Sequence, residues 1–170
     1  MTKIGLLSDT HASLLPQIAD FLKNSDQIWH AGDWGSTEII EDLQKITPIV
    51  KGVYGNIDGP SFSPLLPENL LFHCEEVKVL MTHIGGYPGK YQSRIRKLII
   101  NEKPNLYIAG HSHILKVIFD KKYQCLHLNP GAAGISGFHK LVTAMRFIID
   151  KDKISKLEIF EMERKSILNK

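Results

Sequence analysis

Eight histidines stand out in this chain of 170 residues, because several of them lie next to aspartate or asparagine. Five short clusters share one feature, which is an Asp, His or Asn placed just after an apolar run. The clusters are Ser8-Asp9-Thr10-His11, His30-Ala31-Gly32-Asp33, Gly55-Asn56-Ile57-Asp58, Met81-Thr82-His83 and Gly110-His111-Ser112-His113. In open α/β sheets, ligands bind at the carboxyl ends of the strands. We therefore expect the five clusters to converge, although they are far apart in the sequence.

The spacing inside two clusters supports a common site. In Asp9-Thr10-His11 and in His111-Ser112-His113 the candidate ligands alternate, and alternate side chains of an extended segment point to the same side. Glycines at positions 32, 55 and 110 allow the backbone to turn tightly and to approach a bound ion.

Carboxylate, imidazole and amide oxygen together suit divalent Mn, Fe, Zn or Ni. The clusters contain no cysteine, and the missing thiolate argues against a purely structural zinc site. The candidate ligands are too many for one open site, but they suit two ions that share a carboxylate and lie about 3.5–4 Å apart. These ligands are Asp9, His11, Asp33, Asn56, His83, His111 and His113.

Read along the chain, the clusters give the blocks D-x-H, G-D, G-N-x-D, H and G-H-x-H. This series resembles the calcineurin-like metallophosphoesterases, and within them the small single-domain phosphodiesterases of bacteria and archaea. The blocks span residues 9–113, and the Asn129-Pro130-Gly131 turn with its neighbouring strands fits the same group. Each block alone is common, whereas five in the same order are specific.

The resemblance divides the ligands between two metal ions and implies that Asp33 bridges them. The first ion takes Asp9, His11, Asp33 and His113, and the second takes Asp33, Asn56, His83 and His111. Two divalent ions are the implied cofactor, with Mn as the expected metal and Ni, Fe, Zn or Mg as alternatives. The implied reaction is hydrolysis of a phosphodiester by direct in-line attack of a hydroxide that bridges the metals, with Asp33, Asn56 and His83 next to the chemistry.

The chain departs from the wider superfamily at the position of the acid that protonates the leaving group. Phosphoprotein phosphatases carry a histidine directly after the motif asparagine, and here that position is Ile57, which donates no proton. Asp58 is the remaining candidate for a catalytic acid, although it would have to hold a proton at neutral pH. We therefore expect weak protonation of the leaving group. A second departure is the sequence His83-Ile84-Gly85-Gly86-Tyr87, which lacks a further histidine often found there in the small phosphodiesterases.

The first half of the chain alternates between strand and helix patterns. We expect strands at 3–8, 26–31 and 48–53, and helices at 13–23 and 37–46, with Ser13 as a helix cap. This order predicts βαβ units and a parallel sheet.

The second half is mostly strand. We expect a hairpin of 70–74 with 77–82, a helix at 91–102, and strands at 106–109, 115–120, 123–128, 141–149 and 156–162. The two halves together predict an α/β fold of two packed mixed β-sheets flanked by helices, an αββα sandwich. The absence of repeats and linkers indicates one domain over 1–170.

Composition excludes several classes. With 43% hydrophobic and 23% charged residues the chain has an ordinary globular composition, and no apolar stretch reaches the roughly 20 residues that span a bilayer. A net charge of +3 argues against extended nucleic-acid binding. Two cysteines, Cys74 and Cys125, are too few for a disulfide framework, so a cytoplasmic location is expected.

The remaining histidines are assigned structural or surface roles. His30 lies beside a ligand cluster and is expected to support it or to pack in the core, and the others in this group are His73, His127 and His139.

Two other kinds of function compete with a phosphodiesterase that acts on a small phosphoester. A phosphomonoesterase or nucleotide phosphatase would use the same metals. The retromer scaffold subunit shares the superfamily fold and serves protein assembly, although all the ligand positions are filled here. Small members of the family that the chain resembles often self-associate, so a homo-oligomer is one alternative and the oligomeric state stays open.

Overall fold

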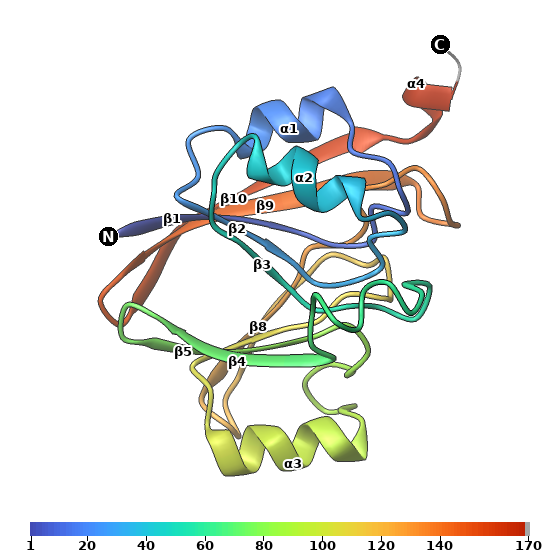
Figure 1. Ribbon diagram of the computed structural model, residues 1–170. Coiled ribbons are helices and arrows are strands. Elements are labelled where there is room, and N and C mark those ends of the chain that lie inside the picture. Colours follow the sequence, from blue (N-terminus) through green and yellow to red (C-terminus); the bar gives the residue numbers. More distant parts are fainter. Residues whose placement is uncertain (169–170) are drawn as a thin grey trace.

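A computed structural model describes residues 1–168, and these form ten strands and four helices. The strands make two five-stranded sheets, ordered β10-β9-β1-β2-β3 and β4-β5-β6-β8-β7. Figure 1 shows the sheets facing each other, with α1 and α2 outside the first sheet and α3 outside the second. The predicted sandwich of two mixed sheets between helices is confirmed.

The first sheet contains the parallel strands that the βαβ pattern predicted. Its parallel part is β1 (Thr2–Leu7), β2 (Gln27–His30) and β3 (Val50–Gly52), connected through α1 (Pro16–Leu22) and α2 (Glu38–Gln44). Two antiparallel strands, β9 (Leu141–Asp150) and β10 (Lys153–Glu163), complete it, and a short helix, α4 (Lys165–Leu168), follows. Because β1, β2 and β3 run in one direction, the segments that follow them emerge at one edge of the sheet.

The second sheet places two further cluster-bearing strands side by side. It consists of β4 (Asn69–Cys74), β5 (Val77–Thr82), β6 (Leu106–Ile108), β8 (Cys125–Asn129) and β7 (Lys116–Asp120), with α3 (Ser93–Glu102) between β5 and β6. β5 and β6 are parallel, so the clusters that follow them also emerge at one edge.

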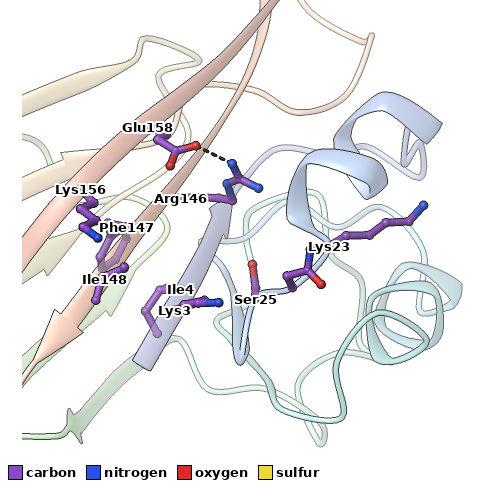
Figure 2. A pocket seen from close by; sticks show the side chains of 10 residues that line it. Lys3, Ile4, Lys23, Ser25, Arg146, Phe147, Ile148, Lys156 and Glu158 are labelled. Carbon is purple, nitrogen blue, oxygen red and sulfur yellow. Dashed lines mark hydrogen bonds and ion pairs between the residues drawn. The ribbon is translucent and has the colours of Figure 1, made fainter. Parts of the chain in front are cut away.

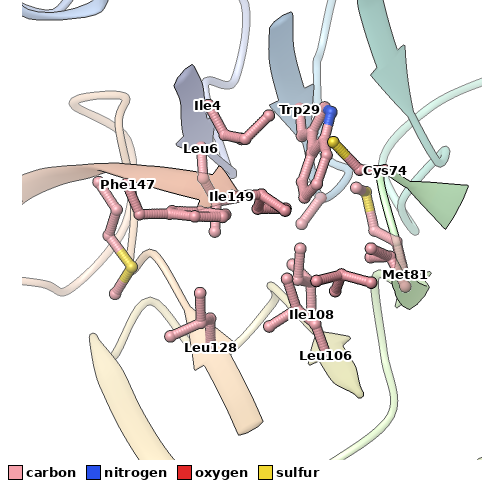
Figure 3. Packing of buried hydrophobic residues seen from close by; sticks show 14 of the residues in the cluster. Ile4, Leu6, Trp29, Cys74, Met81, Leu106, Ile108, Leu128, Phe147 and Ile149 are labelled. Atoms are coloured by element: carbon pink, nitrogen blue, oxygen red, sulfur yellow. The ribbon is translucent and has the colours of Figure 1, made fainter. Parts of the chain in front are cut away.

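The space between the sheets is filled by apolar side chains from both (Figure 3). Trp29 on β2 is fully buried, and its ring lies edge-on to Phe72 of the opposite sheet at 5.0 Å and to Phe147 at 5.8 Å. Burying such aromatic rings removes a large apolar area from water and stabilises the contact of the two sheets.

Two local predictions were wrong. The helix expected from Ser13 begins at Pro16, with Leu15 at the N-cap, because proline suits the first helical position where its missing N–H is not needed. The strand expected from residue 156 begins at Lys153, since Lys156 has a φ of 50° and forms a bulge that breaks the alternation.

A cavity of about 300 Å³ lies at the amino end of β1, away from the strand ends that carry the clusters (Figure 2). Lys3, Ser25, Arg146 and Lys156 are among its lining residues. The Arg146 guanidinium donates a hydrogen bond to the Phe21 carbonyl at 2.8 Å and pairs with a carboxylate on β10. Within residues 1–168, no helix has the length and apolar character needed to cross a membrane.

Candidate metal centre

The five clusters meet where the carboxyl ends of the two sheets face each other. The loops after β1, β2 and β3 bring in Asp9, His11, Asp33 and Asn56, and the loops after β5 and β6 bring in His83, His111 and His113. The convergence that the strand-end pattern predicted is therefore present in the structure.

The candidate ligands fall into two groups. Within each group, the atoms that could bind a metal all lie within 4.8 Å of one another. One group is Asp9, His11 and His113, and the other is Asp33, His83 and His111. The amide oxygen of Asn56 lies 3.1 Å from Nε2 of His83 and so joins the second group. Each group offers oxygen and imidazole nitrogen, the donor set of a catalytic divalent ion.

Asp33 faces both groups, one with each carboxylate oxygen. Its Oδ1 lies 3.1 Å from Nε2 of His83, and its Oδ2 lies 3.8 Å from Nε2 of His11. Its side chain is only 3% exposed. This is the position that a carboxylate shared by two ions would need.

His83 presents a lone pair to the centre. Its Nδ1 donates to the Ala31 carbonyl at 2.7 Å, so in the neutral ring Nε2 carries no hydrogen. Nε2 then faces Asn56 Oδ1 and Asp33 Oδ1, both at 3.1 Å, and three acceptor atoms converge. A proton or a cation is needed to stabilise this arrangement, which is what a metal site provides.

The pKa shifts of His83 and Asp33 indicate the same need for a positive charge. Burial lowers the pKa of His83, but the hydrogen bond with Asp33 and the charges of Asp9 and Asp33 raise it above its usual value. Burial raises the pKa of Asp33, and the hydrogen bond with His83 and its charge bring it below its usual value. A positive charge is therefore favoured between these side chains.

Asp9 and His11 supply buried polar atoms without partners. Oδ2 of Asp9 accepts from the Ser8 hydroxyl at 2.6 Å and from the His111 amide at 3.1 Å. Its Oδ1 and Nε2 of His11 have no hydrogen-bond partner in the part of the chain that the structure describes. Leaving such atoms unpaired is costly, and a divalent cation would satisfy both. The residues present therefore fit a metal pair.

The ligand loops hold a backbone conformation that side chains other than glycine rarely adopt. The φ angles of Asp9, His11, Asp33, His111 and His113 lie between 48° and 66°. Such left-handed residues are strained by about 1 kcal/mol or more each and cluster at functional sites.

Close packing beneath the centre also restricts one neighbouring residue. A Cβ atom at Gly55 would collide with Oδ1 of Asp33, so only glycine fits at this position.

His139 belongs to the site, although we expected a structural or surface role from the sequence. Its Nε2 donates to the Gly134 carbonyl at 3.0 Å, so its Nδ1 is an acceptor, and burial lowers its pKa. Nδ1 of His113 lies 3.1 Å away and donates to it. Nε2 of His113 is then left with its lone pair facing Oδ1 of Asp9 at 3.1 Å. Residue 139 follows no apolar run, so no strand-end pattern marks it.

His30 supports the loop after β1 from the interior, as expected. It is fully buried, its Nδ1 accepts from the Gly32 amide at 3.1 Å, and its Nε2 lies 2.9 Å from the Thr10 hydroxyl. Its ring stacks on Trp34 at 3.7 Å. Burial lowers its pKa well below the usual value, so the ring stays neutral and fixes Thr10, between the ligands of the first cluster.

Asp58, the expected catalytic acid, holds the backbone of two loops at the centre. Its Oδ1 accepts from the Gly35 amide at 2.9 Å and its Oδ2 from the Gly55 amide at 2.7 Å. Both oxygens act as acceptors that shape the loops carrying Asp33 and Asn56. These contacts give Asp58 a role in holding backbone.

Hollows lie on both sides of the centre. One of about 180 Å³ is lined by Asn56, His83 and Arg94, and Arg94 pairs with Glu68 at 2.9 Å. Another of about 480 Å³ is lined by His111, His113, His139 and neighbouring residues. A substrate at the centre has room for groups extending in two directions.

The chain is similar to known proteins in two ways, through a match to a family and through sequence identity to a relative. Residues 2–152 match the calcineurin-like phosphoesterase superfamily domain. A "Probable metallophosphoesterase" from Methanothermobacter thermautotrophicus is 31% identical over 134 residues, which is 76% of each chain.

Solved structures share the fold. A single mutant of Vps29 from Entamoeba histolytica superposes with a TM-score of 0.74 at 17% identity, covering 95% of this chain and 98% of that one. An archaeal protein described as a novel phosphodiesterase superposes with a TM-score of 0.70 at 20% identity, covering 93% and 99%. Together with the converging ligands, the family match over most of its length shows that this chain belongs to the calcineurin-like phosphoesterase superfamily.

Proposed function

We propose that the protein is a dimetal phosphodiesterase that acts on a small phosphoester. The observation that carries this proposal is the position of Asp33 between two groups of oxygen and nitrogen donors, close to buried atoms of Asp9 and His11 that lack partners. When bound there, two divalent ions would activate water for attack on phosphorus and neutralise charge on the phosphoryl oxygens.

The chain's own residues would then orient this chemistry. Asp9, His11, Asp33 and His113 would hold the first ion, and Asp33, Asn56, His83 and His111 the second. The Ala31 carbonyl fixes the ring of His83, and His139 fixes that of His113, so both present Nε2 to the centre. Such hydrogen bonds outside the ligands set the tautomer and the aim of a ligating imidazole.

The site offers little that could protonate the leaving group. Ile57 stands where an acid would follow Asn56, and both carboxylate oxygens of Asp58 accept backbone amides. We infer that the enzyme favours diesters whose leaving groups depart without a proton.

The choice of diester over monoester is supported by the hollows on both sides of the centre, because a diester carries two organic substituents. The novel archaeal phosphodiesterase of the same fold agrees with this choice. A phosphomonoesterase would need only one hollow and a second charged phosphoryl oxygen at the centre.

For the metal we propose Mn, since the donors are carboxylate, imidazole and amide without thiolate, with Ni, Fe, Zn or Mg as competitors. We also propose a single domain, because one apolar cluster draws on both sheets, although residues 169–170 lie outside the described part. Cys74 and Cys125 are buried thiols, which fits the proposed cytoplasmic location.

Scaffolding is the second candidate function, and the shared fold with Vps29 favours it. A scaffold has no need of strained ligand loops or of buried metal-binding atoms that lack hydrogen-bond partners. Both features are present here, so we place catalysis first.

The deciding experiment is hydrolysis of bis(p-nitrophenyl) phosphate and p-nitrophenyl phosphate by metal-stripped protein after addition of Mn, Ni, Zn or Mg. We expect metal-dependent turnover that favours the diester and falls by at least about 10³-fold in His111→Ala and Asn56→Ala. His73→Ala, on β4, is the matched control and should keep full activity. If the folded protein hydrolyses neither substrate with any of these metals, scaffolding becomes the favoured function.

A further inference from the structure

His127 on β8 is a buried histidine without a hydrogen-bond partner. Its residue is 1% exposed, and neither ring nitrogen has a partner within residues 1–168. Tyr107 stacks on its ring at 5.0 Å with an interplanar angle of 24°. Buried polar side chains are nearly always hydrogen-bonded, so two unpaired nitrogens on one ring call for an explanation.

His127 lines a cavity of about 130 Å³ that adjoins the metal centre. The candidate ligand His111 forms part of the same wall, together with Tyr87 and Lys116. The ammonium of Lys116 lies 4.5 Å from the centre of the Tyr87 ring, and most of the remaining wall is apolar. A molecule in this cavity would therefore contact the same residue as a substrate phosphate.

Asn129 and Ser112, two other polar residues of the wall, already have hydrogen-bond partners. Nδ2 of Asn129 donates to the Gly110 carbonyl at 2.9 Å and to the Ser112 hydroxyl at 3.1 Å, and Oδ1 accepts from the Gly131 amide at 3.0 Å. His127 is thus the fully buried polar side chain left to meet an occupant, beside the more exposed Tyr87, His111 and Lys116. Burial lowers the pKa of His127 to about 4, so at neutral pH its ring offers one N–H donor and one lone pair.

We propose that this cavity binds one organic substituent of the phosphodiester, and that His127 selects a neutral group carrying both a hydrogen-bond donor and an acceptor. A sugar or polyol hydroxyl and the edge of a heterocycle share this chemistry. The inference rests on the proposed function, because it places the substituent beside a phosphate at the metal centre. The neutral ring of His127 does not compensate the charge of a carboxylate, so an acidic group would have to pair with Lys116 in the same wall.

The kinetic test uses p-nitrophenyl esters that share a leaving group and differ in the second substituent. The substrates are p-nitrophenyl phenylphosphonate, the p-nitrophenyl ester of thymidine 5′-monophosphate, and the p-nitrophenyl ester of glycerol phosphate. The variants are His127→Phe, which keeps a flat ring without hydrogen bonds, His127→Gln, which keeps a donor and an acceptor, and His73→Phe as the matched control.

We expect His127→Phe to lower kcat/KM about tenfold for the ester that carries the matching group, and to leave the phenylphosphonate within about twofold. His127→Gln should recover part of the loss, and His73→Phe should change none of the rates. Loss confined to the thymidine ester identifies the heterocycle edge, and loss on both polar esters identifies a hydroxyl. Equal changes for all three substrates, or no change, would overturn the proposal.

A second readout is independent of turnover. Zinc-loaded protein with ¹⁵N-labelled histidines is titrated with thymidine 5′-monophosphate and with glycerol phosphate, and the ring nitrogens of His127 and His73 are followed by NMR. We expect saturable shifts at His127 with at least one probe and none at His73. Unchanged His127 signals, as a resident water would give, refute the inference even if the protein is an active phosphodiesterase. Shifts at His127 in a protein that hydrolyses nothing would overturn only the proposed function.

Discussion

Nδ1 of His113 lies 3.1 Å from Nδ1 of His139, and the second ring is itself held by the Gly134 carbonyl. Because His139 donates to this carbonyl from Nε2 and accepts from His113 at Nδ1, the lone pair of His113 Nε2 faces Asp9. The orientation of one candidate ligand is therefore set by a residue outside the motif blocks.

Replacing His139 should weaken metal binding without removing a ligand. In His139→Ala the ring of His113 loses the acceptor that fixes its tautomer, and we expect the affinity of the first site to fall about 10- to 100-fold. Calorimetric titration of stripped protein with Mn measures this, with His73→Ala as the control. His139→Asn, which keeps a side-chain acceptor, should recover part of the affinity. Equal affinities in wild type and His139→Ala would contradict the assigned tautomers.

Metal removal should destabilise the protein. At a metal concentration about 100 times the Kd, each occupied site adds about 2.7 kcal/mol to the free energy of unfolding. For a chain of this size that corresponds to a rise in Tm of about 5–10 °C per site.

Thermal unfolding with and without Mn checks this expectation. In Asp33→Asn, which removes the carboxylate that faces both groups, most of the rise should disappear. An unchanged rise in that variant would show that the stabilising ions bind elsewhere.

The rate should depend steeply on the leaving group. Without an acid beside Asn56, we expect kcat/KM for a series of aryl diesters to fall by up to about tenfold for each unit of leaving-group pKa. Ile57 is 45% exposed, so Ile57→His can introduce an acid without disturbing the core, and it should flatten the dependence. Asp58→Asn should lower all rates alike, because Asp58 holds backbone amides. A flat wild-type series with chemistry rate-limiting would refute this account.

Acid should destabilise the fold partly through His127. Burial lowers the pKa of His127 from 6.5 to about 4, although the Tyr107 backbone raises it in part, and the charge of Lys116 adds a smaller lowering. As pH falls below about 6.5 the unfolded chain takes up a proton there, whereas the folded protein does so only near pH 4. The free energy of unfolding should therefore decrease across this window, by up to about 1.4 kcal/mol per pH unit from this residue.

Urea denaturation of wild type and His127→Phe at several pH values tests the acid effect. Above the window the residue contributes no pH dependence, because both states are neutral. Within it the variant should lose less stability than wild type, although His30, whose pKa is also lowered, keeps some dependence in both. Parallel curves would show that His127 is protonated equally in the two states.

The two layers and the convergence of the candidate ligands could be predicted from the sequence. The layers follow from the pattern of apolar residues along the strands, and the convergence follows from the shared direction of the parallel strands. Buried strands such as Ile4–Leu7 are recognisable as apolar runs, and the residue after a parallel strand must emerge at a known edge. The role of His139 was not predictable, because its contact with His113 depends on how the loop before β9 folds back. The role of Asp58 was missed for a similar reason, since its partners include Gly35, an amide distant in the sequence.

The left-handed backbone at five candidate ligands bears on how such a chain could change over evolutionary time. Each of these residues keeps a conformation that glycine would adopt at lower cost. A lineage that no longer needed metal would gain stability by replacing them, so relaxed selection should erase the ligands at Asp9 and His111 before it erodes the apolar core. The strained residues are therefore the positions at which a loss of metal binding should first become visible in the sequence.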